Sequence, residues 1–417
     1  MRRFTVYLIK TCDFRSLVDQ LRDRRKRPRI PTANVWLSAF LMFVLRLKSF
    51  NRLEQELRVA KRLDSFVGRR KPSADTIGRV FSGFDCAGLR RTMMQINRGA
   101  WRRKAIHGRN GESYRVVAVD GHELWASRSR CCQQCSVREV TVGKGKKKRK
   151  VKEYYHRVVV AQWVGVNPPA ILDIELIKAG EGEVVAARRL LERVFINYSR
   201  LVDVITADAL YLEAPFINTV LDAGKHFVIV MKQEKRDLYQ DADRLRSLFK
   251  PRIIAEGSKT IQIRDIPELT TFGTLGRIVR VVWAEEEAVK HKVIGGKLTD
   301  VQERETWIWV TDLPANLVSA SRVRQWGHDR WNLENRGFNE LVNLWNMDHC
   351  FIHNATAIEA LLLTLSLAFL LTYLFYERNL KPAARLFMTR LAMASRLLQD
   401  LVPLAGSNIW PSLQRSG

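Results

Sequence analysis

The pattern of apolar and polar positions divides the chain into a helical first part and a mixed second part. A long apolar run over Val35–Leu47 predicts a helix, which Thr32 or Asn34 is placed to cap. After a turn-rich stretch at Gly108–Gly111, short β-branched runs replace the helical spacing. We therefore expect a helical domain rich in basic residues over residues 1–105.

Beyond that boundary, strands and helices alternate in the order of an RNase H-like core, an α/β fold built on a mixed sheet. The pattern predicts strands at Tyr114–Val119, Tyr155–Val166, Ala170–Ile177, Leu201–Thr206 and Phe227–Met231, and helices at Glu183–Tyr198 and Ala214–Ala223. The two helices fall on either side of the fourth strand. Glu183 is expected only as an acid in the first turn of its helix.

Charge-rich hairpin strands then interrupt this order, before a buried-type strand at Thr306–Val310 and a helical stretch at Ala320–Leu344. Trp283 lies in the interruption and is expected in its core. The predicted domains after the first are the core's first part over 106–235, a β-rich insertion over 236–305, the core's second part over 306–380 and a helical tail over 381–417.

One segment is apolar enough to suggest a membrane span. Ala360–Tyr376 is seventeen residues without a charge, whereas a span needs roughly 20 apolar residues. A helix that is apolar all round is buried in something. We expect a core helix and no membrane partner, with a membrane span as the alternative.

Charge changes the picture more than composition does. Seventy Lys and Arg residues against forty-three Asp and Glu give a net charge of +27, which favours a polyanionic partner, nucleic acid first. A membrane surface or a ribosome would also fit. Six scattered cysteines and the lack of a signal-peptide pattern favour a reducing cytoplasm, with the protein associated with the nucleoid.

A short turn between two helical segments is the candidate DNA reader of the first part. Ser73 is placed to begin a helix running to Phe81, and Arg69, Arg70 and Arg79 flank the turn. This arrangement suits a helix-turn-helix-like motif. A capped helix in a helical bundle with a solvated basic face explains the same residues equally well.

Two aspartates follow apolar runs and are candidates for metal-dependent chemistry. Asp120 follows Val116–Val119, and Asp208 follows a similar run ending at Ala207. Cleaving a DNA backbone is served by two Mg²⁺ ions held by carboxylate oxygens. Singly, Asp120 before a glycine is also explained as a turn residue, and Asp208 as a helix N-cap. Because two strands of the same predicted core each end in an aspartate, a shared metal-binding site is favoured over two unrelated residues.

The third acid is expected on the polar helix near the end of the predicted core. Arg330 and Glu334 are four residues apart and share a helix face. Trp331, Phe338 and Leu341 can form its packing stripe. The alternative is a surface helix with an ion pair.

These residues carry a family resemblance. Asp329-Arg330-Trp331-Asn332-Leu333-Glu334-Asn335, with Val119-Asp120-Gly121 and Ala207-Asp208-Ala209, resembles the signature of DDE transposases from bacterial insertion sequences of the IS4-like group. The resemblance implies metal-dependent cleavage at the element's ends and strand transfer into target DNA. The acids Asp120, Asp208 and Glu334 would then be both catalytic residues and ligands of two Mg²⁺ or Mn²⁺ ions.

The resemblance also implies contacts with double-stranded DNA, both element ends and target, and a homodimer on that DNA. Arg330 would contact a phosphate near the cut. For Trp283 in the insertion, the resemblance offers stacking on an unpaired DNA base as the alternative to a place in the core.

Gly327 and Leu341 stand where the family often has tyrosine and lysine, residues tied to a hairpin pathway. Arg336 or His328 is the candidate substitute, and Arg336 is expected to bind DNA.

A basic run and a cysteine pair complete the candidates. Lys144–Lys150 holds six basic residues in seven, which predicts a solvated hairpin tip and also a DNA backbone contact; the expected contacts are Lys146, Lys147, Lys148 and Arg149. Cys132 and Cys135, preceded by Cys131, have the spacing of half a zinc site. On folding, Cys86, His122 or Cys350 would have to complete it.

Two other classes of function fit the same chain. A non-catalytic, basic DNA-binding protein would share the charge, and an RNase H-like structure-specific nuclease would share the acids. Three intact acids favour the transposase over the first alternative. The helical N-terminal domain favours it over the second, because a transposase must recognise its own ends.

Overall fold

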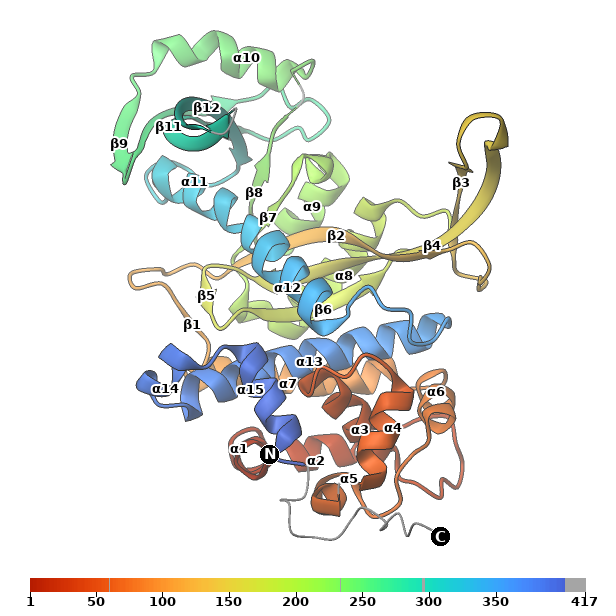
Figure 1. The fold of residues 1–417 in the computed structure, drawn as a ribbon. Helices are drawn as coiled ribbons and strands as arrows, with labels where there is room; N and C mark the ends of the chain where they lie inside the picture. The colour runs from red at the N-terminus through yellow and green to blue at the C-terminus, as the bar shows by residue number, and fades with distance from the viewer. Residues whose placement is uncertain (60, 233, 295–296, 402–417) are drawn as a thin grey trace, which may run out of the picture. The chain divides into compact units, whose positions relative to one another are not determined.

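The computed structural model describes residues 1–59, 61–232, 234–294 and 297–401 (Figure 1). The chain forms two compact units. Unit 1 comprises residues 1–106, 127–133 and 341–417, and unit 2 comprises residues 107–126 and 134–340. Residues 341–380 therefore group with the N-terminal helices, although the predicted core ran to residue 380. The predicted division into five segments stays a prediction.

Unit 1 is a helical bundle in its described residues. Its helices are α1 (Arg2–Cys12), α2 (Phe14–Asp19), α3 (Thr32–Val44), α4 (Phe50–Val59), α5 (Asp64–Val67), α6 (Ala74–Phe81), α7 (Cys86–Arg102), α13 (Ala355–Asn379), α14 (Pro382–Phe387) and α15 (Arg390–Gln399). A 3₁₀ turn over Lys61–Leu63 joins α4 to α5.

Helix α13 lies at the centre of unit 1 and holds the apolar segment of the sequence. It packs against α1, α3, α6 and α7, and the Trp36 indole donates a hydrogen bond to Thr364 Oγ1 at 2.9 Å. Its length and composition would allow it to cross a membrane, yet 94% of its most apolar window is buried inside the protein. In this structure it serves as a core helix, as an all-round apolar helix requires.

The two predicted helix starts in unit 1 differ in outcome. Ser73 caps α6 as expected, with its Oγ accepting from the Thr76 N–H at 3.2 Å. The predicted cap of α3 was wrong, because Pro31 occupies the N-cap position and no side chain caps it. The Thr32 hydroxyl instead donates to Asp23 Oδ2 at 2.5 Å. Proline at this position fixes the backbone at the helix start without a side-chain bond.

In unit 2, ten strands of the described residues form one mixed sheet. Its RNase H-like part has the order β6-β4-β2-β7-β8, in which β2, β7 and β8 are parallel and β4 and β6 are antiparallel. The bounds are β2 (Val116–Ser127), β4 (Arg149–Trp163), β6 (Ala170–Leu176), β7 (Val204–Ala207) and β8 (His226–Val230). A short pair, β1 (His107–Gly108) with β5 (Val166–Asn167), lies apart from this sheet. The predicted mixed α/β order is confirmed.

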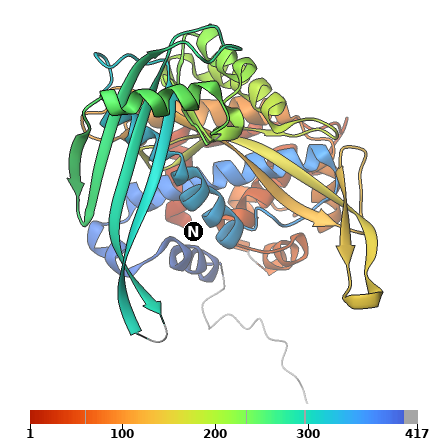
Figure 2. The same cartoon turned by 90° about the horizontal axis from the view of Figure 1, so that it is seen from above.

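Helices cover both faces of this sheet. Helix α8 (Glu183–Tyr198) packs on β4 and β6, and α9 (Ala214–Asp222) packs on β8 and α8. Helix α11 (Ala320–Asp329) packs against β7, β8 and β10–β12. Figure 1 and Figure 2 show α8 and α9 on one side of the sheet and α11 on the other.

The insertion continues the core sheet instead of forming a separate layer. Its elements are α10 (Asp237–Leu245), β9 (Arg252–Glu256), β10 (Lys259–Leu269), β11 (Val279–Ile294) and β12 (Lys297–Thr311). Strand β12 pairs with β8 through Trp309↔Val230, and β11, β10 and β9 follow it outward. The predicted strand Thr306–Val310 is thus the buried end of β12, where the insertion joins the core.

Candidate active site

Strands β2 and β7 place the two predicted aspartates at the same level of the sheet. Their parallel register pairs Val116 with Val204 and Ala118 with Thr206, and each aspartate lies two residues beyond the last of these pairs. Strand β2 does not end at Asp120, as the sequence predicted, but continues to Ser127. This excludes a simple turn at Asp120, because the residue lies within a strand.

Asp208 follows β7 and begins a short 3₁₀ turn over Ala209–Tyr211. Its Oδ1 accepts the Leu210 N–H at 2.9 Å, so the capping role considered from the sequence is real. The cap fixes the carboxylate beside the end of β7, where the register places it next to Asp120. A cap that uses one oxygen is compatible with a ligand role for the carboxylate.

Arg330 connects Asp120 to Glu334. Its Nη1 donates to Asp120 Oδ2 at 3.0 Å and to Glu334 Oε1 at 2.5 Å. The Arg330 side chain is 5% exposed, whereas that of Glu334 is 46% exposed. One nitrogen therefore holds two carboxylates together, and one of the two remains accessible from solvent.

Glu334 lies in a π-helical turn, Leu333–Phe338, between α11 and α12 (Asn339–Trp345). The predicted single helix over Ala320–Leu344 is therefore interrupted at the acid. Such turns widen the backbone by one residue and occur often at functional sites. The packing stripe is partly as predicted: Phe338 and Leu341 are buried, but Trp331 is 37% exposed and contacts the Trp307 ring.

The charge balance at Asp120 is that of a crowded acidic site. The pKa of Asp120 is raised to about 7. Burial is the largest cause, Arg330 opposes it, and the nearby Glu334 and Asp208 carboxylates add to it. A cation would relieve this crowding, and carboxylate oxygens are the ligands that Mg²⁺ and Mn²⁺ prefer. The donor set therefore fits a divalent metal ion.

Glu183, in the first turn of α8 as the sequence predicted, is a fourth carboxylate beside this site, a position that the sequence did not predict. A Cβ added to Gly121 would lie 2.2 Å from Glu183 Cδ, so the carboxylate touches the backbone next to Asp120. The Tyr211 hydroxyl donates to Glu183 Oε1 at 2.8 Å. Burial, then the charge of Glu183, raises the pKa of Tyr211 well above its usual value. No local sequence pattern marks Glu183, because it reaches the site from another element.

Two further contacts hold α11 in place. Arg109 forms a two-pronged ion pair with Asp329, one residue before Arg330. Gly327 lies against the Trp309 indole, because a Cβ at that position would lie 2.0 Å from Trp309 Nε1. The tyrosine that the resemblance led us to consider at this position has no room in this packing.

His328 was a predicted substitute at the DNA end, but it makes a different contact. Its Nε2 lies 2.7 Å from Glu286 Oε1, and Arg324 Nε donates to the same oxygen at 2.7 Å. Burial alone would raise the pKa of Glu286, but the bonds to His328 and Arg324 hold it at about 2. The three residues join α11 to β11 and line a hollow of about 480 Å³ within unit 2.

The predicted DNA-binding residues that the structure describes lie at two places, with Arg330 beside the acids and the others at a hairpin tip. Lys147, Lys148 and Arg149 are exposed at the tip of a hairpin between β3 (Ser136–Val142) and β4, so the predicted hairpin tip is present. The side chains of Lys146 and Arg336 lie outside the described residues. Trp283 is 2% exposed, which makes it a core residue and excludes its stacking on a base.

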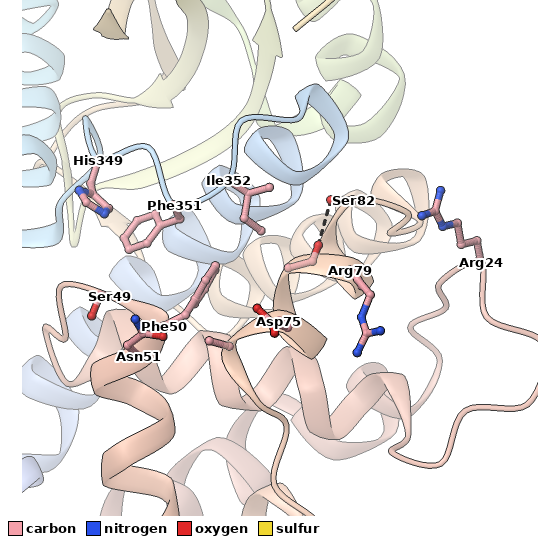
Figure 3. A pocket seen from close by; sticks show the side chains of 12 residues that line it. Arg24, Ser49, Phe50, Asn51, Asp75, Arg79, Ser82, His349, Phe351 and Ile352 are labelled. Atoms are coloured by element: carbon pink, nitrogen blue, oxygen red, sulfur yellow. Dashed lines mark hydrogen bonds between the residues drawn. The ribbon is translucent and has the colours of Figure 1, made fainter. Parts of the chain in front are cut away.

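Unit 1 contains a separate cavity of about 740 Å³. Figure 3 shows Arg24 and Arg79 towards one end of it and His349 and Phe351 towards the other. Asp75, in the first turn of α6, also lines it. None of the three predicted acids lines this cavity, so it is distinct from the candidate active site.

The family of the chain is shown by comparison with known protein families. The model described as "Transposase DDE domain" matches residues 111–371, a range that contains Asp120, Asp208 and Glu334. The chain belongs to this family of DNA transposases, whose members bind DNA and generally use divalent metal ions. No curated protein matches the chain in sequence.

Proposed function

We propose that this protein cleaves DNA at the ends of its own insertion sequence and transfers the freed strand into target DNA. Asp120, Asp208 and Glu334 are the catalytic acids. The observation that carries the proposal is the arrangement of Asp120 and Asp208 at one level of neighbouring parallel strands, with Glu334 joined to Asp120 through Arg330. The assignment to the IS4-like group belongs to the same proposal.

The reaction has two phosphoryl transfers. In the first, a water oxygen bonds to the scissile phosphorus while the bond from phosphorus to the 3′ oxygen breaks, which leaves a 3′-hydroxyl. In the second, that hydroxyl attacks a target phosphorus, and the target's own 3′ oxygen leaves. Asp120, Asp208 and Glu334 would hold two Mg²⁺ ions, which would supply activation of the attacking oxygen and stabilisation of the leaving one. Mn²⁺ suits the same oxygen ligands.

Arg330 is the phosphate-binding residue of this site. Its Nη1 already serves two carboxylates, while its buried Nε has no hydrogen-bond partner among the described residues. A buried donor without a partner costs about 1–3 kcal/mol, a cost that a phosphate oxygen would remove. Because guanidinium groups bind phosphate in a planar, two-pronged manner, Arg330 positions the phosphate next to the acids.

Two basic surfaces bind the DNA at places other than the three acids. Lys147, Lys148 and Arg149 at the hairpin tip bind backbone phosphates, and Lys146 and Arg336 are assigned to the same role. In unit 1, Arg69 and Arg70 precede α6 and Arg79 lies in its last turn. All three are exposed and read the element's ends. The protein acts as a homodimer on DNA, in the cytoplasm and at the nucleoid.

The test uses a duplex that carries the sequence flanking the gene, which contains the element's end. Asp120→Asn, Asp208→Asn and Glu334→Gln are expected to lower Mg²⁺-dependent cleavage at least a thousandfold while leaving end binding within threefold. Asp222→Asn is the matched control, since this acid lies on α9 with a side chain 69% exposed.

Near-normal cleavage by any of the three variants would overturn the assignment of the acids. Cleavage by the wild type without joining to target DNA would make the protein a nuclease of the same fold. Inverted repeats bordered by short direct duplications around the gene are the expected genomic sign of a mobile element.

A further inference from the structure

A buried cysteine and a buried histidine face each other at the base of the β3–β4 hairpin. Cys135 directly precedes β3, and His156 lies on β4. The register pairs Ser136 with Tyr155, so Cys135 and His156 are the next cross-strand pair. Cys135 Sγ lies 3.3 Å from His156 Nε2, and the two residues are 5% and 2% exposed.

The distance suits two ligands of one zinc ion. Zinc binds cysteine sulfur at about 2.3 Å and histidine nitrogen at about 2.0 Å, so two such ligands of a tetrahedral ion lie about 3.5 Å apart. A simple hydrogen bond between the thiol and the imidazole would also give a short contact. It would not explain a second thiol, Cys132, at the ligand spacing C-x-x-C from Cys135.

The chemistry of these groups separates them from the acidic site. Thiolate and imidazole select zinc, whereas carboxylates suit Mg²⁺ and Mn²⁺. Two of the candidates that the sequence offered to complete the site have other contacts. Cys86 Sγ lies 3.7 Å from the Thr356 carbonyl oxygen, and the His122 ring stacks on Phe338 at 4.7 Å.

We propose that Cys132, Cys135 and His156 bind a structural zinc ion, with a fourth ligand from another cysteine or histidine of the chain. Both thiols lose their protons on binding, and the histidine binds as the neutral ring. The ion fixes the base of the hairpin whose tip carries Lys147, Lys148 and Arg149. It is a structural site, separate from the proposed cleavage chemistry.

The direct test is the zinc content of the full-length protein, expressed with zinc and purified without chelators. One zinc per chain is expected for the wild type, by elemental mass spectrometry. Cys132→Ser, Cys135→Ser and His156→Ala are each expected to lower the content at least tenfold. Cys86→Ser, which removes another partly buried thiol, is the matched control and is expected to keep the full content.

The fourth ligand is identified by the same measurement on single variants of four further residues: Cys131, next to Cys132, and His349, Cys350 and His353, which lie within five positions of one another before α13. Replacement of zinc by Co²⁺ in the wild type tests the ligand type without relying on variants that fold. A thiolate-to-cobalt charge-transfer band is expected, and it should be absent from Cys135→Ser.

Three results would overturn the proposal. They are a wild-type zinc content below a tenth of an ion per chain, full zinc content in Cys135→Ser, and a cobalt spectrum without the thiolate band. Hydrogen exchange adds a readout of the role. Removal of zinc is expected to speed exchange at least tenfold in β3 and the adjoining half of β4, and to leave β7 and β8 unchanged.

Discussion

Gly121→Ala tests the packing that brings Glu183 to the candidate active site. The added Cβ would lie 2.2 Å from Glu183 Cδ, whereas ordinary contacts begin near 3.4 Å. The carboxylate must therefore retreat by about an ångström or more, which separates it from the Tyr211 hydroxyl that now donates to it at 2.8 Å.

The expected cost follows from that hydrogen bond. Tyr211 is completely buried, so its hydroxyl would be left without an acceptor. A hydrogen bond to a charged group contributes about 1.5–3 kcal/mol. We expect Gly121→Ala to lower the free energy of unfolding by about that amount. The backbone itself adds little, because Gly121 does not have a positive φ.

Urea unfolding of four proteins measures the effect: the wild type, Gly121→Ala, Tyr211→Phe and the double variant. In the Tyr211→Phe background the bond is already absent, so adding Gly121→Ala should cost at least about 1 kcal/mol less than it does alone. Gly121→Ala combined with Glu183→Ala should also recover part of the loss. Additive costs, within about 0.5 kcal/mol, would refute the contact.

Three further predictions concern other parts of the molecule. Gly327→Ala gains about 1 kcal/mol of helix propensity, but its Cβ would overlap the buried Trp309 indole, and such overpacking costs about 1–3 kcal/mol. We expect urea unfolding to show that the variant is less stable than the wild type and that Trp309→Phe restores part of the loss. A Gly327→Ala variant more stable than the wild type would contradict this packing. Because the pKa of Glu286 is held near 2 against an ordinary value of 4.5, its contribution to stability is present above pH 4.5 and lost as the pH falls to 2. In Glu286→Gln the free energy of unfolding should therefore fall less steeply between pH 4.5 and pH 2 than it does in the wild type. An unchanged pH dependence would rule this contribution out. Replacing Lys147, Lys148 and Arg149 by alanine should lower the salt dependence of DNA binding by up to about 0.9 in logarithmic slope for each phosphate that is no longer neutralised, whereas an unchanged slope would remove the hairpin tip from the interface.

Much of the core fold was predictable because its strands contain short apolar runs rich in β-branched residues. Such runs became β6, β7, β8 and the buried second half of β4, and their order with two helices indicates an RNase H-like core. Strand β3 was missed, since after the buried Ser136 it alternates exposed and half-buried residues up to Val142, and among the described strands it pairs with β4 alone. The sequence also did not reveal that the insertion extends the core sheet, because the pairing of β12 with β8 joins residues about 80 positions apart.

The acids show the same limit. Asp120 and Asp208 could be identified because each follows an apolar run, yet only the register of β2 and β7 places them together. Glu334 was identified through its spacing from Arg330, whereas the π-helical turn around it left no clear pattern.

Glu183 meets Tyr211 from another element, and His156 meets Cys135 across the hairpin. No local sequence pattern marks Glu183 or His156, whereas the C-x-x-C spacing marks Cys135.

Replacing a proposed metal ligand by a softer one tests the central claim most directly. Asp208→Cys, and in parallel Asp120→Cys, exchanges a carboxylate oxygen for a thiolate, which binds Mg²⁺ poorly and softer ions better. We predict that both variants bind the element's end but lose cleavage in Mg²⁺, and that Mn²⁺ restores at least a tenth of the wild-type rate. The Asp222→Cys control should cleave equally with either ion. Normal cleavage by Asp120→Cys or Asp208→Cys in Mg²⁺ would contradict the account, because those carboxylates would then not hold the catalytic metal.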